Sequence, residues 1–126
     1  MPCWRRRWRG VNWIKKNLEM KNAKRGEVWI VDLGMIAKVR PALIFSTSFH
    51  DDERALYAAV PHTTSTRGGR FEVSLPVRFL DKGAFDVQSL GPVRPTMLVR
   101  KVGTLNEQQM AQVETVAKRW LELEQA

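Results

Sequence analysis

The feature that most constrains the fold is a series of short strand-like runs that ends in a single amphipathic helix. The runs are rich in Val, Ile and aromatic residues, and polar and apolar side chains alternate in them, as in strands buried on one face. We expect strands at 27–33, 40–46, 55–60, 71–75 and 96–102, room for a further short strand within 85–90, and a loop at 63–69. Five or six short strands with tight turns favour a small twisted barrel or sandwich.

The last element is predicted to be a helix over residues 105–123. Thr104 and Glu107 fit a capping box, in which the threonine oxygen accepts a hydrogen bond from an early helical amide and the glutamate reaches back. Apolar side chains recur at helical spacing at Leu105, Met110, Val113, Ala117, Trp120 and Leu121. We therefore expect a mainly β fold with a C-terminal helix whose apolar face packs on the sheet.

Size and composition limit the chain to one modest domain. Its 126 residues support a single hydrophobic core and are too few for two. No run approaches the roughly 18 apolar residues of a membrane span. The single cysteine, Cys3, cannot form an internal disulfide and has no nearby Cys or His with which to hold zinc. We expect no metal or cofactor, no stable membrane association, and a reducing cytoplasm as the compartment.

The net charge of +8 lies entirely in residues 1–25, which have nine basic residues and one acidic residue, whereas 26–126 have twelve of each. The first segment also contains Trp4, Trp8 and Trp13. As a helix it would suit an anionic membrane or a nucleic acid; alternatively, Met20 is the true start and 1–19 come from an upstream start. We expect a basic, Trp-rich extension at 1–25 and a domain at 26–126, which could hold a nucleic acid only with a local basic patch.

Two neighbouring segments combine an arginine with hydroxyl groups. Arg40 sits at the start of an apolar strand, a costly place for a permanent cation without a partner. A guanidinium fork matches a phosphate, and the hydroxyl of Thr63 or Thr64 can donate to another phosphate oxygen, so together they could hold a phosphodiester. Two plainer interpretations stay open. Arg40 pairs with Asp32 or Glu72 in a salt bridge, and the hydroxyl groups make only local turn hydrogen bonds.

Four segments occur in a characteristic order along the chain. They are Gly26-Glu27-Val28-Trp29-Ile30-Val31-Asp32-Leu33, Arg40-Pro41, Val60-Pro61-His62-Thr63-Thr64, and a closing strand that leads into the C-terminal helix. In this order they resemble the MazF/PemK family of toxin endoribonucleases from type II toxin–antitoxin systems. The resemblance runs from Gly26 to the C-terminus, and it implies an SH3-like barrel, a homodimer, cleavage of RNA without a metal, and inhibition by a cognate antitoxin protein.

The resemblance also implies roles for individual residues. Arg40 and Thr63 match the family's catalytic arginine and threonine, so single-stranded RNA would be cut by attack of a ribose 2′-OH on the adjacent phosphorus. His62 is a more natural proton carrier than a threonine, which makes it a candidate for catalysis or for stacking on a base. Further candidates for binding RNA are Lys38, Thr64, Arg67 and Arg70, with Phe71 as another stacking residue.

The loop at 34–39 departs from the family pattern. It is short and has no carboxylate, where many family members carry an acidic residue, so an acid or base from this loop would have to come from elsewhere. Its Met35 and Ile36 could instead touch bases or a partner subunit. If the short loop has removed an essential group, the protein would be an inactive RNA-binding barrel. A second alternative is a non-enzymatic toxin that resembles CcdB, which is similar to this family in fold and inhibits a protein such as DNA gyrase. The acidic turn at 51–53 is expected to be a solvated loop, since adjacent carboxylates point in different directions.

Overall fold

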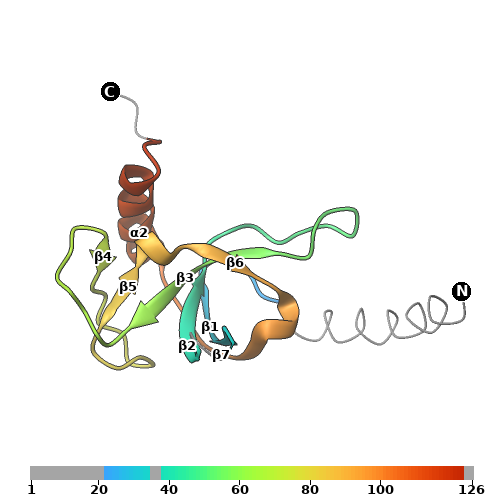
Figure 1. Ribbon diagram of the computed structural model, residues 1–126, viewed down its shortest axis with the longest axis horizontal. Helices are drawn as coiled ribbons and strands as arrows, with labels where there is room; N and C mark the ends of the chain where they lie inside the picture. The colour runs from blue at the N-terminus through green and yellow to red at the C-terminus, as the bar shows by residue number, and fades with distance from the viewer. Residues whose placement is uncertain (1–21, 35–37, 124–126) are drawn as a thin grey trace, which may run out of the picture.

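The structure is a computed structural model that describes residues 22–34 and 38–123. Its elements, in chain order, are β1 (Glu27–Asp32), β2 (Val39–Ile44), β3 (Tyr57–Thr63), β4 (Glu72–Val73), β5 (Ala84–Asp86), the 3-10 turn η1 (Val87–Ser89), β6 (Gly91–Val93), the 3-10 turn η2 (Pro95–Met97), β7 (Leu98–Thr104) and α2 (Glu107–Trp120). Figure 1 shows the strands wound into one curved sheet with α2 at one end. The helix considered for the N-terminal extension and the roles of Met35 and Ile36 fall on residues outside the described ones.

All strand pairs are antiparallel, in the order β4-β5-β3-β2-β1-β7, and β6 also pairs with β3. The long strand β3 is the centre of this arrangement. It pairs with β2 along one side, while β6 and β5 follow each other along the other side. Register shifts between β1 and β7 interrupt the ladder twice, and such irregularities bend a sheet and increase its twist. The last residues of β3 therefore lie between β2 and β5, where the site described below is found.

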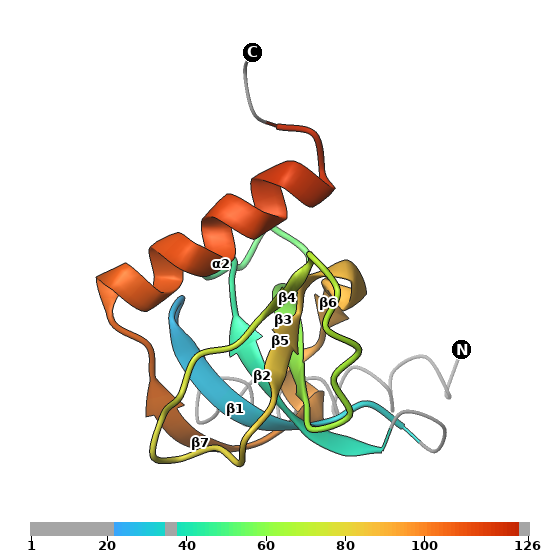
Figure 2. The same cartoon turned by 90° about the vertical axis from the view of Figure 1, so that its left-hand side faces the viewer.

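The curved sheet has an apolar cluster on each face, because successive residues of a strand point to opposite sides. The first cluster joins strand residues to the helix, through Val28, Leu43, Val60, Phe85, Met110, Val113 and Ala117. The second contains Trp29, Val31, Ala42, Ile44, Tyr57, Ala59, Val93 and Leu98. Figure 2 shows α2 lying across the sheet on the side of the first cluster. The expected fold class, mainly β with a C-terminal helix, is confirmed.

Several predicted boundaries were wrong. The third strand continues to Thr63 because its last residues pair with β5, and the fourth strand is only two residues long. The expected strand within 85–90 is shifted to Ala84–Asp86 and is followed by a 3-10 turn. A further strand, Gly91–Val93, was missed, because Pro92 is typical of connections; as a single short partner of β3 it tolerates a proline.

The helix also starts two residues later than predicted. Thr104 ends β7, and the cap is Asn106, whose side-chain oxygen accepts a hydrogen bond from the Gln109 amide at 2.8 Å. The Gln109 side chain accepts in turn from the Asn106 amide at 2.9 Å, so the capping box is present with different partners. Trp120 and Leu121, expected on the packed face, are exposed. Among the described residues no helix is long and apolar enough to cross a membrane.

Candidate functional site

Arg40 and Thr63 are brought together by the pairing of β2 with β3. The ladder pairs Ala42 with Pro61. When this register is continued by two residues along each strand, Arg40 lies opposite Thr63 on one face of the sheet. Both residues line a groove of about 680 Å³, here called the main groove. Its lining is Arg40, Pro61, Thr63, Ser65, Arg67, Gly69, Phe71, Glu72, Asp86, Gln88, Ser89 and Trp120.

A second hollow of about 270 Å³, the side hollow, adjoins the main groove. Its lining is Lys38, Val39, Arg40, Pro41, His62, Thr63, Thr64, Ser65 and Asp81. The two hollows share Arg40, Thr63 and Ser65, so these three residues stand where the hollows meet. A bound chain that runs from one hollow to the other must pass the guanidinium and the hydroxyl groups.

The hydroxyl group of Thr63 makes the local hydrogen bond that its sequence context suggests. Its Oγ1 accepts from the Ser65 amide at 3.0 Å. A hydroxyl group has one hydrogen to donate in addition to its acceptor sites. The bond to Ser65 therefore fixes the orientation of Thr63 and leaves its O–H able to donate to a ligand in the groove.

Arg40 is exposed, which corrects the expectation of a cation placed at cost in an apolar strand. Full burial in β2 begins only at Ala42. The two carboxylates considered as its salt-bridge partners both accept backbone amides. Asp32 accepts from Gly34 at 3.0 Å, and Glu72 accepts from Arg67 at 3.0 Å and Gly68 at 2.8 Å.

Glu72 shapes the loop that carries Arg67. Its carboxylate holds two consecutive amides of the loop, and the second belongs to Gly68, whose φ of +68° lies in the left-handed region that favours glycine. This clamp folds the loop back onto the start of β4 and places Arg67 in the lining of the main groove. A second cation is thereby added to the lining of the main groove.

His62 lies deeper than its sequence neighbours. Its side chain points to the face opposite that of Thr63, is 4% exposed, and meets the ring of Phe85 edge to face with the centroids 5.0 Å apart. Burial lowers the pKa of His62 below its ordinary value, and the carboxylate of Asp81 opposes this shift in part. His62 is therefore neutral near neutral pH, and it borders only the side hollow.

The other predicted contacts divide between the two hollows. Lys38, with a φ of 60°, and Thr64 border the side hollow. Arg70 lies outside the lining of both hollows, and its guanidinium carbon stands 4.5 Å from the centre of the Phe71 ring. The predicted RNA-binding residues thus surround the junction, with Arg70 at its periphery.

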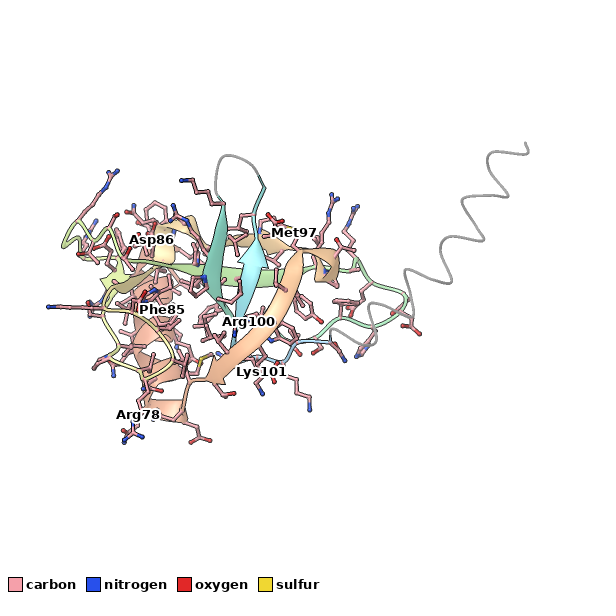
Figure 3. All side chains as sticks on the ribbon, turned by 90° about the horizontal axis from the view of Figure 1, so that it is seen from below. Arg78, Phe85, Asp86, Met97, Arg100 and Lys101 are labelled. Carbon is pink, nitrogen blue, oxygen red and sulfur yellow. The ribbon has the colours of Figure 1, made fainter. Side chains whose placement is uncertain are left out.

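Sequence reasoning named Phe71 as a stacking residue but missed the rest of the main groove beyond this junction. This part of the groove is formed by Phe71 and Trp120, whose ring centroids are 5.1 Å apart, together with Asp86, Gln88 and Ser89. Figure 3 shows Asp86 next to Phe85 on β5, while Arg100 and Lys101 lie on β7 at an edge of the sheet. No signal in the sequence links position 71 with position 120, because only the packing of α2 brings them together.

Among the described residues, one set of side chains could hold a metal ion, and it lies at the turn around 51–53 that was expected to be solvated. His50, Asp52 and Glu53 could each direct one ligand atom to a common point, with these atoms within 4.8 Å of one another. All three residues are exposed, and none lines the main groove or the side hollow. The potential metal ligands and the two hollows therefore lie at different places in the described part of the chain.

Comparisons with known proteins identify the family of the chain. The family described as PemK-like, MazF-like toxin of type II toxin–antitoxin system matches residues 24–121. A comparison with curated protein sequences gives no match.

Solved structures show the same fold at low sequence identity. A mycobacterial endoribonuclease in complex with its cognate antitoxin is 23% identical, with a TM-score of 0.71 over 82% of this chain and 99% of that one. The Mycobacterium tuberculosis toxin MazF-mt6 is 22% identical, with a TM-score of 0.67 over 79% and 99%. A MazE–MazF structure from Deinococcus radiodurans is 20% identical, with a TM-score of 0.66 over 79% and 94%. Since the family match spans nearly all of the described residues, the chain belongs to the PemK-like, MazF-like toxins of type II toxin–antitoxin systems.

Proposed function

We propose that this protein is a metal-independent, sequence-specific endoribonuclease that cuts single-stranded RNA. The observation that carries the proposal is the position of Arg40 and Thr63, which stand side by side where the main groove meets the side hollow. A phosphate at this junction would meet a bidentate cation and a hydroxyl donor, and the nucleotides on either side would occupy the two hollows.

The reaction needs no nucleophile from the protein. The ribose 2′-OH gives its proton to a base and attacks the adjacent phosphorus, the bond from phosphorus to the 5′-oxygen breaks, and this oxygen takes up a proton. The products are a 2′,3′-cyclic phosphate and a 5′-OH. Negative charge builds up on the non-bridging oxygens, where the guanidinium of Arg40 neutralises it and Thr63 donates a hydrogen bond. Preorganised donors of this kind are typically worth about 3–4 kcal/mol each in the transition state.

The burial of His62 decides which of its two candidate roles, stacking on a base or transferring a proton, it can have. Its buried ring is packed on Phe85, so it is unsuited to stacking on a base. The neutral imidazole could accept the 2′-OH proton only through the side hollow, which it lines. The cleavage rate of a His62→Gln variant, measured as a function of pH, tests whether His62 accepts this proton. If the rate of the variant still rises with pH as the parental rate does, the proton is accepted by another group.

Local charge has to attract the RNA, since residues 26–126 carry no net charge. Lys38 and Arg67 border the two hollows on either side of Arg40, and Arg70 stands at the periphery. We assign these side chains to phosphate contacts, with Thr64 as a hydroxyl donor in the side hollow. Binding by a few phosphate contacts should weaken with salt, but with a shallow slope.

Partners follow from the family and from what similar structures contain. Two of the solved structures are a complex with a cognate antitoxin and a MazE–MazF assembly. We propose that this chain likewise forms a homodimer and is silenced by a cognate antitoxin whose acidic segment covers the cationic junction. Charge complementarity at the junction supports the proposal, because RNA and an acidic segment would compete for the same cations.

The test is to incubate the purified protein with RNA in EDTA and to analyse the fragment ends. We expect cleavage at a preferred sequence, cyclic phosphate ends, and loss of cleavage in Arg40→Ala without loss of folding. Arg40→Lys should also be poor, since a point charge does not reproduce the fork. Arg54→Ala removes the same charge outside both hollows and should cut like the parent.

Cleavage by Arg40→Ala at the parental rate would contradict the site. If the parent itself binds RNA without cutting it, the protein is an inactive RNA-binding barrel. If it neither binds nor cuts RNA, the alternative of a CcdB-like inhibitor of a protein partner takes its place.

A further inference from the structure

The main groove is electrically divided. At the junction it offers the guanidinium of Arg40, whereas the carboxylates of Glu72 and Asp86, which lie opposite each other in the β4–β5 ladder, line the main groove but not the side hollow. A phosphate is repelled by those carboxylates, while the edge of a nucleobase carries hydrogen-bond donors that they can accept. Phosphate and base should therefore bind in different parts of the groove.

We propose that Phe71, Trp120, Asp86, Gln88 and Ser89 form a subsite for one RNA base adjoining the cleaved phosphate, and that it selects bases with an exocyclic amino group over uracil. This inference rests on the proposed function, because it assumes that the bound polymer is RNA. It adds the residues that choose the sequence.

The aromatic pair supplies a stacking surface. Trp120, in the last turn of α2, is 40% exposed, although it belongs to the residue type that gains most from burial. The Phe71 ring tilts 56° against it at 5.1 Å, and the guanidinium of Arg70 covers Phe71 at 4.5 Å. This packing fixes both rings at the groove, so a base stacks on Trp120 without first ordering it.

Selectivity comes from Asp86. Its Oδ2 accepts a hydrogen bond from Ser89 Oγ at 2.6 Å, which fixes the orientation of the carboxylate and leaves Oδ1 to accept from a ligand. An ionised carboxylate is only an acceptor, so it suits the amino group of cytosine, adenine or guanine and repels the O4 of uracil. The Gln88 amide, exposed in the same lining, can both donate to and accept from a neighbouring ring position.

The experiment measures binding to RNA that cannot be cut. Fully 2′-O-methylated oligonucleotides of C, A or U lack the attacking hydroxyl, and their affinities for the full chain can be followed by anisotropy. We expect the C and A oligonucleotides to bind more tightly than U. Trp120→Ala should weaken them by roughly 5- to 150-fold, the usual range for loss of one stacked base, and Trp120→Phe by much less. Leu121→Ala, the adjacent residue at 48% exposure and outside the groove lining, is the matched control and should bind like the parent.

Asp86→Asn tests the base edge. Its amide can donate to uracil O4, so the preference for C and A over U should shrink or reverse while total affinity changes little. Asp51→Asn, an exposed carboxylate in a remote turn, should keep the parental preference. If Trp120→Ala fails to fold by circular dichroism, Asp86→Asn and Gln88→Ala still decide, since neither removes the aromatic pair.

The outcomes separate this inference from the proposed cleavage. A parent that binds these oligonucleotides with a Trp120-dependent preference but cuts no RNA refutes the cleavage and keeps the subsite. A parent that cuts RNA while Trp120→Ala and Asp86→Asn bind and select bases as the parent does overturns the subsite. If Trp120→Ala instead loses only a protein partner, the surface belongs to that partner and the inference is wrong.

Discussion

The hydroxyl group of Thr63 makes a hydrogen bond within its own turn and also faces the main groove. It accepts the Ser65 amide and so stabilises the turn after β3, and it faces the groove beside Arg40. Thr64, the next residue, is exposed, and it borders the side hollow but not the main groove. The pair therefore offers an internal comparison between a hydroxyl at the junction and one beside it.

Thr63→Val should lower kcat for RNA cleavage by about 10- to 150-fold, the range for losing one hydrogen bond to a charged group. Thr63→Ser keeps the oxygen for both the turn and the phosphate, so it should retain most of the rate. Thr64→Val is the control and should lose less than Thr63→Val. Single-turnover cleavage, with urea unfolding of each variant, measures both effects. Equal losses at the two positions would mean that the turn as a whole is structural.

The buried His62 should make stability depend on pH. Its pKa is lowered in the folded chain, chiefly by burial, so the unfolded chain binds a proton at a higher pH than the folded chain does. The contribution is complete above the ordinary histidine pKa of about 6.5 and is lost as the pH falls through the folded value. Urea unfolding of the parent should therefore show a larger loss of stability on acidification than unfolding of His62→Gln.

Asp81→Asn provides the check on that assignment. Asp81 opposes the shift, so its removal should lower the pKa of His62 further and enlarge the acid-induced loss of stability. An identical pH dependence in the parent and in His62→Gln would show that His62 does not titrate across this range.

The end of β3 and the start of β5 approach each other closely at Gly83. β3 pairs here through Thr63 with Ala84, and a Cβ at Gly83 would lie 2.1 Å from the Thr63 carbonyl oxygen and 2.8 Å from the His62 ring. The first of these atoms belongs to the backbone and cannot rotate away. Gly83 is required for this close approach, and it sets how far β5 lies from Thr63.

Gly83→Ala should therefore destabilise the fold by about 1–3 kcal/mol, as overpacking usually does, and should also reduce cleavage because the strand end that carries Thr63 must move. Gly91→Ala is the matched control, since its Cβ would meet the Ser89 carbonyl oxygen at an ordinary 3.6 Å. Urea unfolding and cleavage rates measured on both variants test the prediction. A Gly83→Ala protein as stable and active as Gly91→Ala would contradict it.

Local patterns predicted the elements better than their ends. Alternation and β-branched residues located most of the strands, and the junction residues Arg40 and Thr63 followed from two short motifs in adjacent strands. The prediction placed the cap at Thr104 because a Thr-x-x-Glu pattern competes with the Asn-x-x-Gln pattern that the structure uses. Trp120 was assigned to the packed face, and this was wrong. Helical spacing shows which residues lie on one face of the helix, but it does not show how far along the helix the sheet covers that face. Of the proposed subsite beyond the junction, only Phe71 was named from the sequence. Its other residues could not be predicted, since their meeting depends on packing between distant segments.

The net charge of +8 lies in the segment before Gly26, here called the leader, and the last residues of this segment are packed against the sheet. Asn22 and Ala23 contact the second apolar cluster: the buried Tyr57 hydroxyl donates to Asn22 Oδ1 at 2.9 Å and accepts from the Ala23 amide at 3.2 Å. Ser48 Oγ donates to the Ala23 carbonyl at 3.2 Å. These bonds explain how a short segment before β1 is held against the sheet.

We therefore propose that the functional domain includes Asn22 and Ala23, and that two shortened chains will differ. A chain beginning at Met20 keeps the contacts to Tyr57 and should unfold at the same urea concentration and cleave RNA like the full chain. It should bind RNA less tightly at low salt, because it lacks six basic residues of the leader, and raising the salt should shrink that difference.

A chain beginning at Gly26 leaves the buried Tyr57 hydroxyl without both partners, which should cost about 1–3 kcal/mol of the free energy of unfolding. Asn22→Ala in the full chain should show part of this loss. If the chain from Met20 is itself unstable or inactive, Trp4, Trp8 and Trp13 contribute to the fold, and residues 1–19 are not dispensable.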